Sequence, residues 1–288
     1  MSGLLGIEPG APGSGRARYG RAMTLYAEGR ITAAQLEAYR VAAADDRQGP
    51  GQVLDAHGLA VPEDAAPAGE AAIRTLISAA DAYLATLDGP GVTDVRSGIA
   101  KWRDGPVTAA RPASSPASHP VVATHLPAAL AALQGTHPTL AAAISGAAPH
   151  LTWIAYDGYD PAAIGQAFAQ GHAYASIIGE DRSAIPAHDF DLGIFLIAPH
   201  VLYRDRCHAA PELYAPLTGP HGWRFAPGDP LTIRPAHTPV WNPPHQPHLT
   251  KVGPVPFLCL FGWTRDVQET ARVIPADDWP ELEALRLG

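Results

Sequence analysis

The chain has 288 residues, and its 28 acidic and 20 basic side chains give a net charge of −8. Because a nucleic-acid-binding surface needs clustered Lys and Arg, and the basic residues here are scattered, we expect no nucleic-acid partner. No stretch is long and apolar enough to cross a bilayer, and the N-terminus lacks an export signal, so we expect a cytoplasmic protein with no membrane partner. Two cysteines are too few for a disulfide scaffold or a four-thiolate zinc site, so any metal must bind to His and carboxylate groups.

Alanine-rich segments predict a mainly helical region over residues 1–148. Thr32 and Gln35 fit a capping box at the start of one helix. Residues 105–120 are rich in Pro, Ser and Ala without an apolar period, which predicts a linker or long loop. Apolar patterns predict further helices over residues 69–88, 122–134 and 138–147.

The pattern changes near Leu151, and residues 149–288 are predicted to form a separate domain of short strands. A single helix is expected over Pro161–Gln170. Many short runs broken by Pro and Gly are typical of a sandwich or a closed barrel. The strand-like runs are Leu151–Tyr156, His172–Ile178, Leu192–Ala198, Glu212–Thr218, Leu231–Arg234, His248–Val252 and Phe257–Thr264.

One segment combines residue types that ligate metals. In a strand, residues two apart share a face, so His208 would point the same way as Arg206. By the same spacing Glu212 shares a face with Tyr214. If a turn lies between the two pairs, both point into one barrel. His248 begins a distant strand-like run and offers a second imidazole.

Two imidazoles and one carboxylate form a known ligand set for a divalent metal ion that keeps positions open for water or substrate. We therefore expect one divalent ion as cofactor, bound to His208, Glu212 and His248. Zinc, iron(II), manganese and nickel all suit these ligands, and the sequence does not choose between them.

Two segments resemble the conserved motifs of cupins. Arg206–Gly219 resembles the first motif, in which HxH is followed by three or four residues, Glu, six residues and Gly. Pro243–His248 resembles the second motif, PxGxxH, with His245 in the place of the glycine. Arg206 stands where many cupins have the first metal histidine, which favours two His plus Glu over a three-histidine site. The resemblance implies an α+β protein, with an N-terminal helical region followed by a C-terminal antiparallel β-barrel of the cupin (double-stranded β-helix) type.

A closer resemblance, over roughly residues 150–270, is to cupin-type dimethylsulfoniopropionate (DMSP) lyases. As in that family, Tyr203 lies five residues before His208, and Tyr214 lies two residues after Glu212. The resemblance implies a metal-dependent carbon–sulfur lyase that splits DMSP by β-elimination into acrylate and dimethyl sulfide. Further similar segments are Phe195–Pro199, Glu212–Gly219, Trp223 and Phe257–Trp263.

The chemistry of that elimination suggests roles for individual residues. The proton next to a carboxylate is weakly acidic, and a metal bound to the carboxylate stabilises the charge that develops. Tyr214 is the expected base, because it shares a face with the carboxylate ligand and a nearby metal lowers the pKa of a phenol. Tyr203 is expected to position the substrate, although packing alone would also explain either tyrosine. Arg206 is a candidate anchor for the substrate carboxylate, and Trp241, Trp263 and Phe195 are candidates to attract the sulfonium.

Other functions stay open on the sequence alone. The same ligand set serves iron(II)-dependent cupin dioxygenases. A related cupin could also act on, or only bind, a different small carboxylate. The expected partner in each case is a small-molecule carboxylate. Whether the N-terminal helices cover the barrel or form a homodimer stays equally open.

Overall fold

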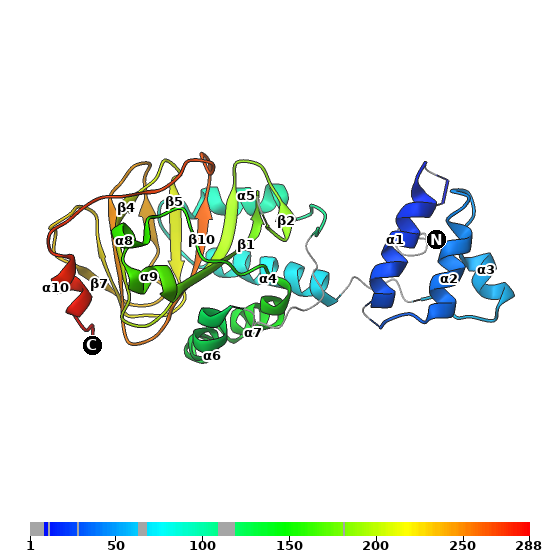
Figure 1. Cartoon of the computed structure of the whole chain (residues 1–288), viewed down its shortest axis with the longest axis horizontal. Coiled ribbons are helices and arrows are strands. Elements are labelled where there is room, and N and C mark those ends of the chain that lie inside the picture. The colour runs from blue at the N-terminus through cyan, green and yellow to red at the C-terminus, as the bar shows by residue number, and fades with distance from the viewer. Residues whose placement is uncertain (1–8, 11, 28, 63–67, 109–118, 181) are drawn as a thin grey trace. The chain divides into compact units, whose positions relative to one another are not determined.

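A computed structural model of the chain divides it into two compact units, Met1–Ala71 and Ala72–Gly288 (Figure 1). The predicted linker over 105–120 falls mostly outside the residues that the structure describes. Those are residues 9–10, 12–27, 29–62, 68–108, 119–180 and 182–288.

The first unit is helical, as the sequence predicts. The capping box is confirmed, because the Gln35 amide donates to Thr32 Oγ1 at 3.2 Å and the Thr32 amide donates to Gln35 Oε1 at 2.8 Å. Leu25, Tyr39 and Leu54 are buried and give this unit its own small core. Its helices are α1 (Ser14–Ala27), α2 (Ala33–Ala42) and α3 (Gly51–Ala56).

Helices also open the second unit. Those predicted over 69–88, 122–134 and 138–147 are confirmed, with the first ending at Leu84. Prolines at the first turns of α6 and α7 suit these positions, where a backbone N–H has no intrahelical partner. No helix among the described residues has the length and apolar character needed to cross a bilayer. The helices are α4 (Ala68–Leu84), α5 (Val92–Trp102), α6 (Pro120–Gln134) and α7 (Pro138–Ala147), followed by the short 3-10 helix η3 (Ala148–His150).

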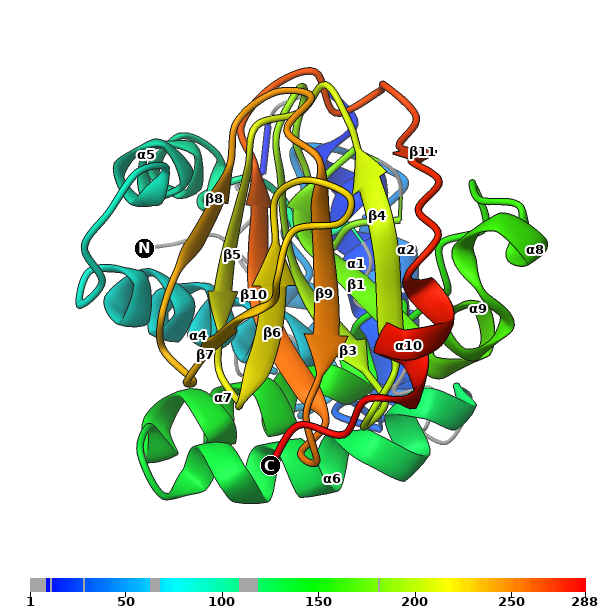
Figure 2. The same ribbon diagram turned by 90° about the vertical axis from the view of Figure 1, so that its left-hand side faces the viewer.

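Two sheets form the body of the second unit (Figure 2). Their strand orders are β2-β1-β3-β10-β5-β8 and β11-β4-β9-β6-β7. The described strand pairs are antiparallel except for β1 and β2. The strands are β1 (His172–Gly179), β2 (Ile185–Pro186), β3 (Asp191–Ile197), β4 (Leu202–Cys207), β5 (Glu212–Pro216), β6 (His221–Arg224), β7 (Thr232–Arg234), β8 (Val240–Asn242), β9 (His248–Val252), β10 (Phe257–Trp263) and β11 (Arg272–Val273).

The prediction of a strand over Leu151–Tyr156 is wrong. Only an isolated bridge from Ile154 to Tyr174 forms there. The Tyr156 amide donates to the His172 side chain at 2.8 Å, so a side-chain bond replaces a ladder bond. The helix predicted over 161–170 breaks at Gly165, whose φ of +95° lies outside the helical region. It becomes α8 (Pro161–Ile164) and α9 (Gln166–Gly171).

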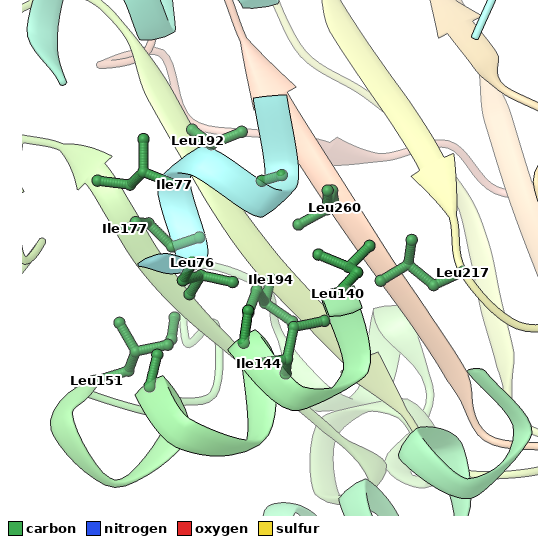
Figure 3. Close-up of a cluster of buried hydrophobic side chains, with 14 of the residues drawn as sticks. Leu76, Ile77, Leu140, Ile144, Leu151, Ile177, Leu192, Ile194, Leu217 and Leu260 are labelled. Carbon is green, nitrogen blue, oxygen red and sulfur yellow. The ribbon is translucent and has the colours of Figure 1, made fainter. Parts of the chain in front are cut away.

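The outer face of the six-stranded sheet packs against helices. Figure 3 shows side chains of α4 and α7, such as Leu76 and Ile144, directed at strand residues such as Ile194 and Leu260. All four are essentially buried. The predicted domain boundary at residue 148 therefore lies inside one compact unit, just before the part of the chain that holds the strands. Helices from Ala72 onward share one core with the sheet.

The inner face of the same sheet turns toward the second sheet. Because side chains alternate along a strand, Phe195 and Phe261 point inward while their neighbours point at the helices. They pack with Tyr203 and Trp223 of the five-stranded sheet. The predicted α+β architecture is confirmed. Most of the predicted site residues lie in the space between the two sheets, and Trp241 does not.

The chain end braces the five-stranded sheet. Arg224 on β6 donates to both Asp205 on β4 and Asp278, and the Trp279 indole donates to Asp205 at 2.7 Å. Asp278 precedes the last helix, α10 (Trp279–Ala284). Since Asp205 and Arg224 are fully buried, this ion-pair network fixes β4 next to the site.

Candidate metal centre

Three side chains from three strand ends converge between the sheets. His208 directly follows β4, Glu212 begins β5 and His248 begins β9. All three are buried, and one potential ligand atom of each lies within 4.8 Å of the others. The Glu212 Oε2 atom lies 3.1 Å from Nε2 of His208 and 3.6 Å from Nε2 of His248. The structure thus brings together the ligand set that the sequence predicts.

Hydrogen bonds fix the tautomers of both histidines. Nδ1 of His208 lies 2.8 Å from the carbonyl oxygen of Ala210, and Nδ1 of His248 lies 2.8 Å from that of Gln246. A carbonyl oxygen can only accept, so each Nδ1 carries a proton, which leaves Nε2 as the atom that each ring can offer to a metal. Nε2 of His248 is buried and has no hydrogen-bond partner within the described part of the chain. An orphaned, buried lone pair beside a carboxylate is what a metal ligand requires.

Glu212 is held in place by its cross-strand neighbours. Trp263 and Asn242 lie directly opposite it on β10 and β8. The Trp263 indole N–H donates to Oε1 at 2.8 Å, and the Asn242 amide donates to Oε2 at 3.3 Å. Such donors orient a carboxylate toward a metal. Asn242, which sequence reasoning did not single out, is therefore part of the site.

The protonation states also suit a cation. Burial and the positive charge of Arg206 lower the pKa of His248 well below its usual range, so this imidazole is neutral near pH 7. Burial alone would raise the pKa of Glu212, but His208, Arg206 and the Trp263 donor hold it below its usual value. A neutral imidazole and an ionised carboxylate are the forms that ligate divalent metals. The residues present therefore fit a divalent ion.

A pocket of about 210 Å³ opens beside this cluster. The predicted residues Tyr203, Tyr214, Trp263 and Phe195 line it together with the two ligands His208 and Glu212. The remaining lining residues are largely aromatic or acidic, and they are Tyr156, Tyr159, Tyr174, Ser176, Glu180, Asp191, Phe261, Val267, Gln268 and Ala271.

Arg206 lies behind the pocket wall and does not line the pocket. Its side chain is fully buried, and its guanidinium carbon lies 3.3 Å from the centroid of the Tyr203 ring. It donates to the Tyr214 hydroxyl at 3.2 Å and to Thr250 Oγ1 at 3.4 Å. The predicted role as a direct anchor for a substrate carboxylate does not agree with this position. Arg206 instead holds two pocket tyrosines from behind.

The pocket tyrosines differ in their partners. The hydroxyls of Tyr203 and Tyr159 lie 3.0 Å apart and share a hydrogen bond. Burial raises the pKa of Tyr214 well above the usual value and the charge of Glu212 adds to this, whereas Arg206 acts in the opposite direction. Tyr214 is thus the pocket tyrosine whose oxygen accepts a hydrogen bond from a fixed positive charge.

Trp241 points away from the pocket. Asn242 faces Glu212, so the preceding residue on β8 faces the opposite side of the sheet. Trp241 packs against the outer apolar cluster, and a side chain at Gly91 would collide with its ring. It is not among the described residues that line the pocket. A substrate contact is therefore not expected for Trp241.

Sequence reasoning missed several lining residues. Tyr156 and Tyr159 lie on an irregular loop with no periodicity that would indicate the face of a side chain. Asp191 carried a usable signal, because it is a charged residue at the start of an otherwise apolar strand. Charges at such a position need a partner, which makes them candidates for a site.

Comparisons with known proteins bear on more than half of the chain. The dimethylsulfoniopropionate lyase family matches residues 100–259. No sequence among curated proteins matches the chain. A solved structure from a crystallographic study of the DMSP lyases RdDddP and RnDddQII is 21% identical, with a TM-score of 0.54, and the match covers 72% of this chain and 100% of that one. The DMSP lyase DddQ from Ruegeria pomeroyi is 18% identical, with a TM-score of 0.52, and the match covers 72% and 98%. These likenesses show that the chain shares its fold with structures described as DMSP lyases, and its two sheets are not joined into a closed barrel by the described strand pairs.

Proposed function

Because the chain belongs to the dimethylsulfoniopropionate lyase family, we propose that it is a metal-dependent carbon–sulfur lyase acting on DMSP. The observation that carries the proposal is the buried His208, Glu212 and His248 cluster opening onto a pocket that also presents Tyr214. The reaction is β-elimination, which yields acrylate and dimethyl sulfide.

His208, Glu212 and His248 would hold one divalent ion, with zinc, iron(II), manganese and nickel as candidates. Held there, the ion would bind the substrate carboxylate and stabilise the enolate-like charge. Trp263 and Asn242 keep the Glu212 carboxylate oriented toward the two imidazoles. A small-molecule carboxylate is thus the proposed partner.

Tyr214 is the proposed base. Its oxygen takes the proton from the carbon next to the carboxylate, and the electron pair of that C–H bond forms the carbon–carbon double bond. The carbon–sulfur bond breaks at the same time, and its electron pair leaves with dimethyl sulfide. Arg206 supports this role as a positioning residue, since it donates to the Tyr214 oxygen and its positive charge favours the phenolate.

Tyr203 is proposed to position the substrate, because it lines the pocket and is held between Arg206 and Tyr159. Its ring stacks on Phe168 with the centroids 3.8 Å apart, so its place is rigid. A rigid wall beside the ligands limits the orientations that a small substrate can take.

Oxygen dependence tests this function. We expect metal-loaded protein to release dimethyl sulfide from DMSP at equal rates with and without oxygen, measured in the headspace. A dioxygenase with the same ligands would need oxygen. Turnover that stops without oxygen, or no dimethyl sulfide with any of the four metals, would contradict the proposal.

A further inference from the structure

The pocket has a second end, away from the metal ligands. Three residues lie opposite one another across adjacent strands, in the order Glu212 on β5, Trp263 on β10 and Asp191 on β3. Neighbouring strands are about 4.8 Å apart, so Asp191 lies roughly 10 Å from Glu212 along this row. Both carboxylates line the pocket, and the Trp263 ring lies on the strand between them.

The next row on the same face of the sheet supplies an aromatic wall beside these two ends. It runs from Tyr214 through Phe261 to Gly193. A Cβ at Gly193 would lie 2.4 Å from the Phe261 ring and 2.7 Å from the Ala175 carbonyl oxygen. Because Gly193 has no side chain, the Phe261 ring lies over β3 and forms part of the pocket lining.

No ion pair joins Asp191 to a basic side chain among the described residues. The Ser176 hydroxyl donates to its Oδ2 at 3.0 Å, while its Oδ1 atom is buried without a hydrogen-bond partner among the described residues. Glu180 lines the same pocket and adds a second negative charge. Burial, followed by the charge of Glu180, raises the pKa of Asp191 to about 7. A buried carboxylate in this condition is stabilised by a cation.

Aromatic rings surround this acidic end. Tyr156, Tyr174 and Trp263 line the pocket together with Asp191. The charge of Asp191 contributes, after burial, to raising the pKa of Tyr174 to about 12, so the two groups are close. Aromatic faces and carboxylates are the two groups that proteins use to bind onium ions.

We propose that Asp191, assisted by Glu180 and by the faces of Tyr174 and Trp263, forms a cation subsite that selects substrates carrying an onium group two carbons from a carboxylate. The span from Glu212 to Asp191 matches such a molecule, with its carboxylate toward the metal ligands and its onium group toward Asp191. The inference rests on the proposed function, because it assigns the sulfonium end of the same substrate.

Two probes of equal shape measure the contribution of the positive charge to binding. 3-(Trimethylammonio)propanoate and 4,4-dimethylpentanoate have the same shape and the same carboxylate, and differ only in the positive charge. We expect wild-type protein to bind the cationic probe roughly 10- to 100-fold more tightly than the neutral one, measured by calorimetry. In Asp191→Asn this preference should fall to within a few-fold, while binding of the neutral probe stays unchanged.

Asp189→Asn is the matched control. Asp189 lies two residues from Asp191 and is exposed, and it does not belong to the pocket lining. Its substitution removes the same charge and should leave the preference intact. Glu180→Gln should reduce the preference for the cationic probe less than Asp191→Asn does. It also gives a second measurement of that preference if Asp191→Asn binds neither probe.

Equal binding of both probes by wild type, or an undiminished preference in both carboxylate variants, would overturn the cation subsite. Failure of the wild type to bind the cationic probe would also overturn it. These binding measurements need no turnover. A protein that prefers the cationic probe but releases no dimethyl sulfide would contradict the lyase function and leave the subsite standing.

Discussion

The two faces of the six-stranded sheet carry different kinds of residue on the same strands. On β10, Leu258 and Leu260 face the helices, whereas Phe261 and Trp263 belong to the site side. The outer face is aliphatic and tightly buried, and the inner face is aromatic and carries charged groups at the pocket. Because side chains alternate along a strand, one set of residues stabilises the fold against the helices and the other set lines the site.

The largest expected effect on the inner face comes from losing a metal ligand. His248→Ala should weaken binding of the divalent ion by more than about 100-fold, because it removes a buried imidazole whose Nε2 faces Glu212. The metal content, measured by elemental analysis, and the lyase rate should fall together. His245→Asn is the control, since His245 is an exposed histidine three residues away with a φ of 60° that Asn tolerates. Full metal occupancy in His248→Ala would contradict the assignment of His248 as a metal ligand.

An outer-face substitution should reverse this pattern. Leu260→Ala removes a buried side chain that packs against helices, and should lower the free energy of unfolding by about 2–5 kcal/mol. Metal content and the lyase rate of the folded protein should stay close to wild type. Leu285→Ala, at a leucine that is 40% exposed, should change stability by less than about 0.5 kcal/mol in the same denaturation series. A stable Leu260→Ala that lost metal would break the separation of the two faces.

The smallest predicted effect is a pH dependence at the acidic end. Since the pKa of Asp191 is raised to about 7, its carboxyl is mostly neutral at pH 6 and mostly charged at pH 8. The ratio of cationic to neutral probe affinity should therefore rise about tenfold over this range. Ser176, Tyr174 and Glu180 lie close to it, and the pKa of Tyr174 lies well above the range. The exposed His188 side chain lies 3.5 Å from Glu180. A ratio that is flat in wild type would contradict the assignment to Asp191.

Much of the inner face was readable from the sequence. The spacing of His208, Glu212 and His248 identifies the ligand cluster that the structure assembles, and Glu212 and His248 begin strands that the apolar pattern predicts. His208 follows β4, which was not among the predicted strand-like runs. Six of the seven predicted strands are confirmed to within two residues of their bounds, and β2, β4, β6, β8 and β11 were not predicted.

The residues that were misplaced or missed have a common cause. The pattern along one strand does not say what lies behind a ring or across a sheet. Arg206 shares a face with His208 but is stacked behind Tyr203, and Trp241 occupies the strand position that faces the helices. Asp191 is placed beside the site by the pairing of β3 with β10, which sets it opposite Trp263, a residue far along the chain. Such pairing is set by the tertiary fold.

The central claim is that Tyr214 and the metal ligands act together on the inner face, and Tyr214→Phe tests it most directly. The variant keeps the ring but loses the oxygen that accepts a hydrogen bond from Arg206. Metal content and the rate of dimethyl sulfide release from DMSP should be measured on the same preparation. We predict metal content near wild type and a rate lowered by about 10²–10⁴-fold, as for the loss of a general base. A near-normal rate in Tyr214→Phe would contradict the account and make Tyr203 the next residue to test.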